Sequence, residues 1–246
     1  MLAITKSIAL QGLDGYLISI QVDISAGMPH FEIVGLPDTS VRESKERVKT
    51  AIKNSGAEFL SRKIVINLAP ANTRKEGSGL DLAIAVGVLA ASGYIDNTSN
   101  EELFNNIIFV GELSLNGNIE KINGILPICI EAKRLGIKRI ILPKENAKEA
   151  SYILGIEIIA VETLVEVMQY LNKEKEIKSE INRNILDETK QEYSMDFSEV
   201  KGQENVKRAL EISAAGGHNC ILIRNTRLRK NNACKKVTNH ITRSKF

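Results

Sequence analysis

The stretch KIVINLAPANTRKEGSGLDLAIAVGVLAASG, residues Lys63–Gly93, contains a strand, a polar turn and a helix in direct succession. Its first part, KIVINLAP, is a short aliphatic run rich in β-branched side chains, which is typical of a buried strand. The segment Gly79–Gly93 is apolar almost throughout and predicts a buried helix that closes at Gly93, because glycine tolerates the backbone conformation of a helix end. The turn between them consists of Arg74, Lys75, Glu76, Gly77 and Ser78.

The same alternation continues on both sides of this stretch. The sequence predicts strands at 3–10, 17–24, 31–34, 138–143 and 156–162, and helices at 38–56, 125–136, 145–153 and 163–172. The pair Asn116-Gly117 is a strong turn signal and predicts a hairpin across 106–122. Because a short turn joins the first two strands, we expect them to run antiparallel. The sequence therefore predicts a mixed α+β fold.

The helix at 38–56 has clear signals at both ends. Asp38, Thr39 or Ser40 can cap its start, and Gly56 stops it. Its apolar face is formed by Val41, Val48 and Ile52. The helix also carries the basic residues Arg42, Lys45, Arg47 and Lys49, which Glu43 and Glu46 interrupt. We interpret these charges as a solvated face, with a DNA-binding face as the alternative.

The charge of the chain is unevenly distributed. Its 246 residues include 33 Lys or Arg and 30 Asp or Glu, a net charge of +3. Eight of the basic residues and none of the acidic ones fall within 224–246, so the rest of the chain has a net charge of −5. A basic surface for nucleic acid is therefore not expected on the body of the protein. With 43% hydrophobic residues, the chain can bury a core.

The remaining composition points to a cytoplasmic protein. Cys129, Cys220 and Cys234 form no CxxC pair and are too few for a disulfide framework, which suits a reducing compartment. The N-terminus has no signal-peptide pattern, and no apolar run approaches the roughly 20 residues that span a bilayer. We expect no membrane partner. His30 and His218 have no second ligand at metal spacing, so no metal site is predicted.

A change in composition separates a second module from the first domain, 1–172. Residues 173–195 are charged and nearly free of apolar side chains, as in a linker, with a solvated helix as the alternative. A new module begins with DFSEVKGQENVKRALEISAAGGHN at 196–219. It predicts a helix, the loop AAGGHN and then the strand CILI, Cys220–Ile223.

Several long motifs resemble one family. HFEIVGLPDTSVRESKERVKTAIKNSG, INLAPANTRKEGSGLDLAIAVG and FVGELSLNGNIEKINGILP resemble the N-terminal domain of the magnesium-chelatase-like AAA+ ATPases of the ComM type. The segment 196–219 resembles the start of their AAA+ module, so the resemblance covers 1–223. It implies a Lon-protease-like, ribosomal-protein-S5-domain-2-like fold over 1–172. It also implies an incomplete AAA+ α/β fragment over 196–223.

The resemblance implies an activity for intact relatives. They are ATP-dependent homo-oligomeric rings that use ATP and Mg²⁺ and act on DNA, where they drive branch migration in recombination and transformation. In these relatives, the strand that corresponds to Cys220–Ile223 is followed by a glycine-rich phosphate loop. The backbone N–H groups of that loop hold the phosphates. Here the loop is expected after Ile223, flanked by Gly216, Gly217, His218 and Asn219. The residues after Ile223 include no glycine, so no cofactor site is intact and no cofactor is expected in this chain.

A shifted reading frame explains the basic segment 224–246. Back-translation of RNTRLRKNNACKK with permitted codons, followed by removal of one base, spells GTPGSGKTMLAKK, a complete phosphate loop and the start of its helix. We interpret 224–246 as a frameshifted, disordered tail, whether the shift is natural, marks a pseudogene or arose in sequencing. The alternative is an arm whose eight positive charges bind nucleic-acid phosphates.

The resemblance to Lon proteases raises the question of peptidase activity. Their Ser–Lys dyad needs a serine nucleophile and a lysine base within hydrogen-bond reach. The Lon motif places Gly79 at the serine position and Ile128 at the lysine position, so no catalytic residue is predicted. Ser78, one residue earlier, is the alternative nucleophile, with Lys75 or Lys121 as its base. The competing interpretation is that Ser78 only shapes the turn.

The polar turn Arg74–Ser78 also has two interpretations. Arg74, Lys75 and Glu76 can contact nucleic acid or a neighbouring subunit. Alternatively, the turn only leads into the helix, with Glu76 and Asp81 near its positive end.

Taken together, these patterns predict the N-terminal fragment of a ComM-like AAA+ ATPase, without ATPase activity of its own and monomeric or weakly associating. The alternatives are a non-catalytic scaffold or interaction domain and a degenerate Lon-like peptidase domain.

Overall fold

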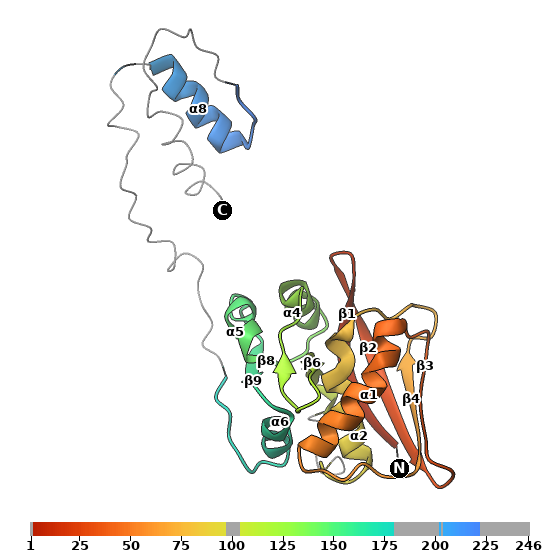
Figure 1. The fold of residues 1–246 in the computed structure, drawn as a ribbon. Helices are drawn as coiled ribbons and strands as arrows, with labels where there is room; N and C mark the ends of the chain where they lie inside the picture. The colour runs from red at the N-terminus through yellow and green to blue at the C-terminus, as the bar shows by residue number, and fades with distance from the viewer. Residues whose placement is uncertain (1, 97–103, 180–201, 203, 222–246) are drawn as a thin grey trace. The chain divides into compact units, whose positions relative to one another are not determined.

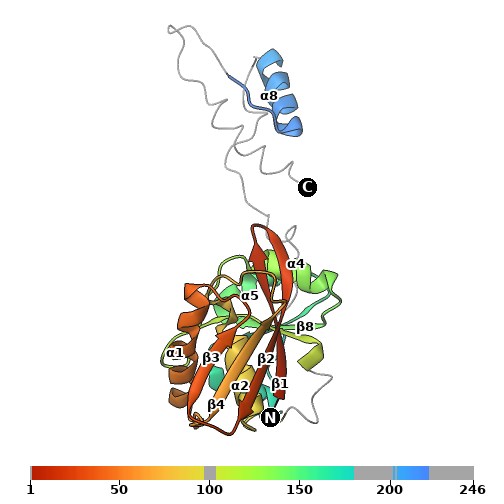
Figure 2. The ribbon, with the colours of Figure 1, turned by 90° about the vertical axis from the view of Figure 1, so that its right-hand side faces the viewer.

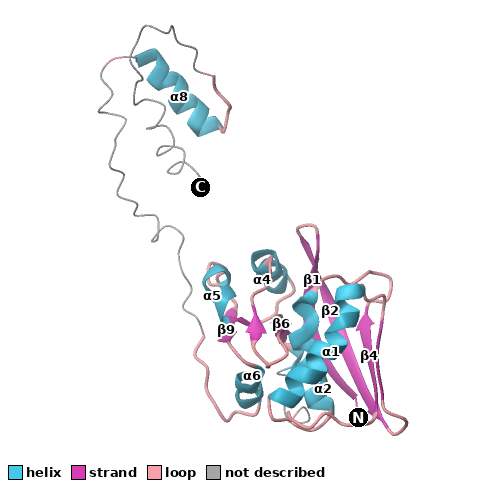
Figure 3. Cartoon of the chain, viewed as in Figure 1, coloured by secondary structure: helices cyan, strands magenta, loops and turns pink. Residues whose placement is uncertain are grey.

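The structure is a computed structural model in which residues 2–96, 104–179, 202 and 204–221 are described (Figure 1). The chain divides into two units, Met1–Ile185 and Leu186–Phe246, and each is described on its own. Strands and helices alternate along the first unit (Figure 3). This alternation confirms the prediction of a mixed α+β fold. The predicted linker, for the most part, and the basic segment 224–246 lie outside the described residues.

A four-stranded mixed sheet forms one layer of the first unit. Its strands are β1 (Leu2–Gln11), β2 (Asp14–Ser25), β3 (His30–Val34) and β4 (Lys63–Ala69), in the order β1-β2-β4-β3. β1 and β4 both pair antiparallel with β2, whereas β3 runs parallel to β4. Every second residue of β2 from Ile18 to Ile24 is buried, as the two-residue period of a strand with one covered face requires.

Helix α2 (Asp81–Ala91) lies behind this sheet in Figure 2 and packs on β1 and β2. All of its residues are buried. The helix comes so close to the sheet that a Cβ atom on Gly87 would lie 2.7 Å from Cγ2 of Val22. The apolar run in the sequence therefore marks the central helix of the unit, as predicted.

Helix α1 (Thr39–Asn54) packs on α2. Of the three candidate caps, Asp38 is the one used, because its Oδ1 accepts a hydrogen bond of 2.7 Å from the N–H of Val41. Val41, Val48 and Ile52 are buried, which confirms the predicted apolar face. Gly56 follows the helix end with a φ of +85°, a conformation that favours glycine.

A second, three-stranded sheet consists of β5 (Ile107–Phe109), β8 (Arg139–Pro143) and β9 (Glu157–Val161), all parallel. The helices α4 (Ile125–Arg134), α5 (Lys144–Ala150) and α6 (Leu164–Leu171) alternate with its strands. The neighbouring residues Ile140 and Ile141 of β8 belong to two different core clusters. Both faces of this sheet are therefore covered, which is usual for parallel sheets.

The hairpin predicted across 106–122 is shorter than expected. Only β6 (Glu112–Leu113) and β7 (Ile119–Glu120) pair antiparallel, around Gly117. β5 joins the parallel sheet instead, because its three buried residues need strand partners for their backbone groups. Residues distant in sequence hold the turn of this hairpin. Asn54 Nδ2 donates a hydrogen bond of 2.7 Å to the carbonyl of Leu115. The N–H of Leu164 donates one of 2.9 Å to the carbonyl of Gly117.

In the second unit, α8 (Glu204–Gly216) forms where a helix is predicted. Cys220 and Ile221, the first residues of the predicted strand CILI, are exposed and belong to no strand. The prediction of a strand is therefore wrong for these two residues. The other two residues of CILI lie outside the described residues.

Candidate functional site

A pocket of about 250 Å³ lies where the polar turn meets β1, the β6–β7 hairpin and α4. Apolar side chains form much of its wall, with Ile8 and Leu10 from β1 and Ile128 from α4. Glu76, Ser78, Glu112 and Lys121 supply its polar and charged groups. An apolar hollow with a few polar groups is the usual form of a small binding site.

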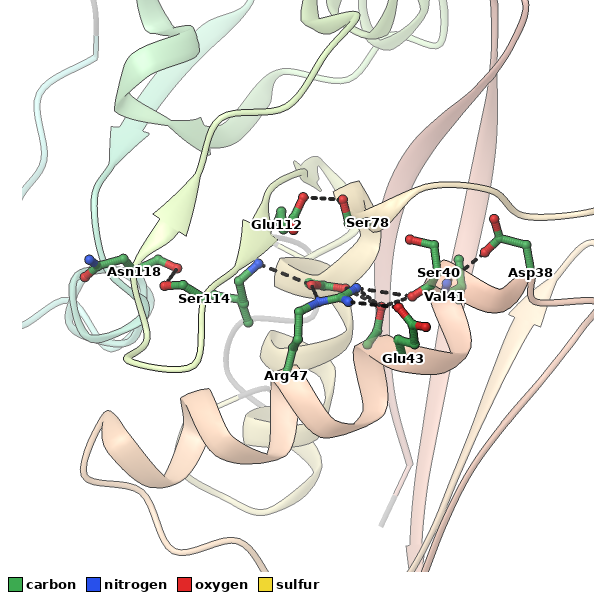
Figure 4. Close-up of polar contacts among 12 residues, drawn as sticks. Asp38, Ser40, Val41, Glu43, Arg47, Ser78, Glu112, Ser114 and Asn118 are labelled. Carbon is green, nitrogen blue, oxygen red and sulfur yellow. Dashed lines mark hydrogen bonds and ion pairs between the residues drawn. The ribbon is translucent and has the colours of Figure 1, made fainter.

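A hydrogen bond between Ser78 and Glu112 crosses the polar part of this pocket (Figure 4). Gly77, with a φ of +87°, turns the chain into the short 3-10 helix η1 (Ser78–Leu80), and Ser78 is its first residue. The Ser78 hydroxyl donates to Oε2 of Glu112 on β6. Both residues are half-buried. The pair therefore joins the polar turn to the hairpin.

The two positions that correspond to the Lon dyad meet in this same pocket. Gly79 and Ile128 are 49 positions apart in the sequence, yet both line the hollow. Gly79 offers no side chain, and Ile128 is a buried aliphatic residue in the second core cluster. A Cβ atom on Gly79 would meet no atom closer than Ile122 at 3.9 Å, so the place of a nucleophile is open.

Of the two lysines considered as a base for Ser78, the structure places only Lys121 in the pocket. Lys121 is exposed there. Lys75 is fully buried, and its Nζ donates to the carbonyls of Pro70 and, at 2.7 Å, Thr73. Lys75, one of the two alternatives for the base, is therefore bonded to backbone carbonyls rather than to Ser78. Desolvation by burial lowers the pKa of Lys75.

Lys75 anchors the polar turn to the rest of the fold. Its N–H donates to the carbonyl of Leu36 at 3.1 Å, and its carbonyl accepts from the N–H of Asp38 at 3.0 Å. Its neighbours Arg74 and Glu76 are exposed and pair at 3.5 Å. The hydroxyl of Tyr16 donates to the carbonyl of Arg74 at 2.9 Å. The buried Lys75 thus fixes the turn, and the side chains of Arg74 and Glu76 are exposed to solvent.

Backbone and side-chain bonds fix the walls of the pocket. The N–H of Gly111 donates to the carbonyl of Gly79 at 3.0 Å, and the N–H of Leu82 donates to the carbonyl of Gly111 at 3.0 Å. The buried Asn146 of α5 holds Ile122, accepting from its N–H and donating to its carbonyl, both at 2.9 Å. Contacts distant in sequence therefore fix Gly79 and Ile122, two of the lining residues.

Asp81, fully buried at the start of α2, holds three elements together through hydrogen bonds. Its carboxylate accepts from Arg47 Nε at 2.7 Å, from the Ser44 hydroxyl and from the N–H of Leu113 at 3.2 Å. Desolvation raises the pKa of Asp81, and the hydrogen bonds from Arg47 and Ser44 oppose that rise. The hydrogen bond to Asp81 raises the pKa of Arg47.

The sequence did not predict this network. Arg47 was expected on a solvated face, but its side chain is only 20% exposed and pairs with Asp81. Asp81 was expected near the positive end of the helix, where it lies, but no partner was predicted for it. One signal for the pair was present in the sequence, because Asp81 is the lone carboxylate of an apolar helix. A carboxylate that is buried with such a helix needs an oppositely charged partner.

In the second unit, the flanks of the expected phosphate loop form the end of α8. The N–H of His218 donates to the carbonyl of Ser213 at 2.9 Å, and Gly217 has a φ of +64°. This pattern is the Schellman motif that ends many helices. Gly216 lies against the His218 ring, where a Cβ atom would be 2.4 Å from Nε2. Asn219 is exposed, and the loop expected after Ile223 lies outside the described residues.

Neither a metal-binding cluster nor a membrane-spanning helix occurs among the described residues. No group of three or more His, Cys, Asp or Glu side chains is placed to hold a metal ion. No helix among these residues combines the length and the apolar character needed to cross a membrane.

Comparison with protein families gives two matches along the chain. The family described as subunit ChlI of Mg-chelatase matches residues 20–146. A second family, described as magnesium chelatase, subunit ChlI, matches residues 196–239. The two matches fall on either side of the predicted linker.

Individual relatives match over most of the chain. Competence protein ComM of Haemophilus influenzae is 36% identical over 226 residues, which is 90% of this chain and 43% of the relative. The uncharacterized protein YifB of Salmonella typhimurium is 41% identical over 90% of this chain and 42% of its own length. Lon protease 2 of Bacillus subtilis is 31% identical over 73% of this chain and 36% of its own length.

The chain thus spans less than half the length of the relatives that it matches. Its motifs, the family matches on both sides of the linker and the identity to ComM and YifB agree with one another. The chain therefore belongs to the magnesium-chelatase-like ComM family.

Proposed function

We propose that this chain is the N-terminal part of an ATP-driven AAA+ motor that acts on DNA in the cytoplasm, and that its first unit is a non-catalytic interaction domain. The Haemophilus relative is named a competence protein, which supports an action on DNA during transformation. Branch migration is the form of that action which the family resemblance implies. The Lon relative supports a Lon-protease-like, ribosomal-protein-S5-domain-2-like fold for the first unit. The whole protein would assemble as a homo-oligomeric ring.

The pocket carries the proposal of a non-catalytic first unit. Its two dyad positions hold Gly79 and Ile128, which have neither a nucleophile nor a base. Ser78 reaches a carboxylate, Glu112, rather than a lysine. A hydroxyl that donates to a carboxylate is a common structural contact, and the fold here uses it to join the turn to the hairpin. A scaffold role therefore fits these residues better than peptidase activity.

ATP and Mg²⁺ belong to the intact motor in this proposal, not to this chain. The residues present do not fit the cofactor, because the sequence after Ile223 contains no glycine and no GK[ST] motif. A side chain at these positions keeps the backbone from approaching a phosphate closely. We therefore derive no nucleotide chemistry from this chain.

Binding of a fluorescent ATP analogue tests the proposal. The 246-residue chain should show no saturable binding at micromolar concentration and no ATPase activity, with or without forked DNA. The longer protein, with the reading frame restored and its downstream module present, should bind the analogue and hydrolyse ATP in a DNA-stimulated manner. Saturable binding by the 246-residue chain, or a restored protein that ignores both ATP and DNA, would contradict the proposal.

A further inference from the structure

The pocket beside Ser78 contains the carboxylate of Glu112, which forms no ion pair with an ammonium group among the described residues. Glu112 accepts one hydrogen bond through Oε2, from Ser78. A carboxylate has about four acceptor positions on its two oxygens, so one bond leaves capacity for a cationic donor. Arg47 contributes charge nearby, but its guanidinium donates to Asp81, to Ser44 and to the carbonyl of Ser40.

The remainder of the pocket suits an aliphatic chain. Ile8 and Leu10 of β1, Ile122 and Ile128 form apolar walls around the polar end. The charged lining residues are Glu76, Glu112 and Lys121, a net charge of −1. Ile128 is buried and lines the same pocket as Glu112, so the pocket combines an aliphatic wall with a carboxylate.

The walls are preorganised. Asp81 holds the N–H of Leu113, next to Glu112, and Asn146 holds both backbone groups of Ile122. A ligand therefore need not order the pocket in order to bind, which lowers the entropy lost on association.

We propose that this pocket binds a primary alkylammonium group, with the ammonium at Glu112 and the aliphatic chain against Ile8, Ile122 and Ile128. The group can come from a free alkylamine or from a lysine side chain of a polypeptide, and both share this chemistry. An ammonium group has three hydrogen-bond donors and no acceptor. It therefore complements the Glu112 carboxylate, which accepts a hydrogen bond from the Ser78 hydroxyl and has further acceptor positions. The proposal goes beyond the function proposed above and does not depend on ATP or DNA.

Titration of the 246-residue chain, labelled at isoleucine δ1 methyls, with n-pentylamine tests the proposal by NMR. The methyl signals of Ile8, Ile122 and Ile128 should shift saturably, with a Kd on the order of 1 to 10 mM for so small a ligand. n-Pentanol, which has the same chain without the charge, should bind at least about tenfold more weakly. Equal shifts with both ligands, or no saturable shift up to roughly 50 mM amine, would overturn the proposal.

A second arm identifies the source of the amine. Nα-acetyl-lysine amide is compared with Nα-acetyl-norleucine amide, which lacks the ammonium. Tighter binding of the lysine derivative than of n-pentylamine supports a polypeptide lysine, whereas binding of n-pentylamine alone supports a free amine. Either result supports an alkylammonium site.

Variants assign the interaction to Glu112. Glu112→Gln keeps an acceptor for Ser78 and removes the charge, so it should weaken amine binding at least about tenfold. The matched control is Glu162→Gln, because Glu162 pairs with Lys144 at 2.5 Å outside this pocket and its loss should leave binding unchanged. The dispersion of the methyl spectrum shows whether each variant is folded. Unchanged binding in folded Glu112→Gln would overturn the assignment.

Discussion

Arg47 and Asp81 form a two-point ion pair between α1 and α2, with Nε of Arg47 2.7 Å from Oδ2 of Asp81 and Nη2 3.2 Å from Oδ1. The Asp81 side chain is fully buried, whereas that of Arg47 is 20% exposed. Through its bond to the N–H of Leu113, the same carboxylate also sets the position of the β6–β7 hairpin. One buried charge therefore links the helical layer to the wall of the candidate pocket.

Asp81→Ala should destabilise the first unit by about 3 to 5 kcal/mol, because it leaves the half-buried Arg47 and the buried Ser44 without their acceptor. Urea unfolding followed by circular dichroism measures the change. The control is Glu157→Gln, which breaks the more exposed Arg139–Glu157 pair and should cost about 1 kcal/mol or less. Equal midpoints for Asp81→Ala and the wild-type chain would show that the pair is not structural.

A double variant separates the charge from the packing. Asp81→Leu alone leaves the guanidinium of Arg47 unpaired, whereas Asp81→Leu with Arg47→Met replaces both charges with apolar groups. We expect the double variant to be more stable than Asp81→Leu by roughly 1 to 3 kcal/mol. A double variant no more stable than the single one would point to packing rather than to the unpaired charge.

Lys75 gives a pH dependence with a definite sign. Burial lowers its pKa in the folded state, so between the folded and unfolded pKa values the unfolded chain binds more protons. The free energy of unfolding of the wild-type chain should therefore rise, relative to that of Lys75→Met, as the pH increases through the range just below the unfolded lysine pKa of about 10.4. Denaturant titrations of both proteins across this range measure the difference. A difference that stays constant or falls with pH would contradict a lowered pKa.

Cys129 should resist thiol reagents until the first unit unfolds. Its side chain is fully buried, and burial raises its pKa to about 12. At pH 8 only about one thiol in 10⁴ would be ionised, even if reagent could enter. In a Cys220→Ser, Cys234→Ser background, labelling with a chromogenic disulfide should follow the unfolding rate and become faster in Asp81→Ala. Complete labelling of the folded chain within minutes would show that Cys129 is accessible.

Peptidase activity should be absent from this chain. Gly79 and Ile128 line the pocket at the dyad positions, and Ser78 donates to Glu112. A casein-type assay should show no turnover above that of Ser78→Ala. Turnover that disappears in Ser78→Ala would instead establish Ser78 as a nucleophile, with Glu112 or Lys121 as the first candidates for its base.

The sequence alone was sufficient for features that depend on neighbouring residues. The sequence limited the cap of α1 to Asp38, Thr39 or Ser40, and the structure uses Asp38. Val41, Val48 and Ile52 are buried because helical spacing puts them on one face. The long motifs were also sufficient to recognise the family, which the comparisons confirm.

Partners distant in sequence were decided only by the tertiary structure. β5 pairs with β8 rather than within the hairpin, the backbone of Lys75 pairs with Leu36 and Asp38, and the Arg47 side chain pairs with Asp81 instead of lying on a solvated face. The tertiary structure also decided the pocket, which brings Ser78 next to Glu112 and places Gly79 and Ile128 in the same lining. Local patterns set the period and the ends of an element, whereas a buried polar group takes whichever partner the packing of distant elements brings within hydrogen-bond reach.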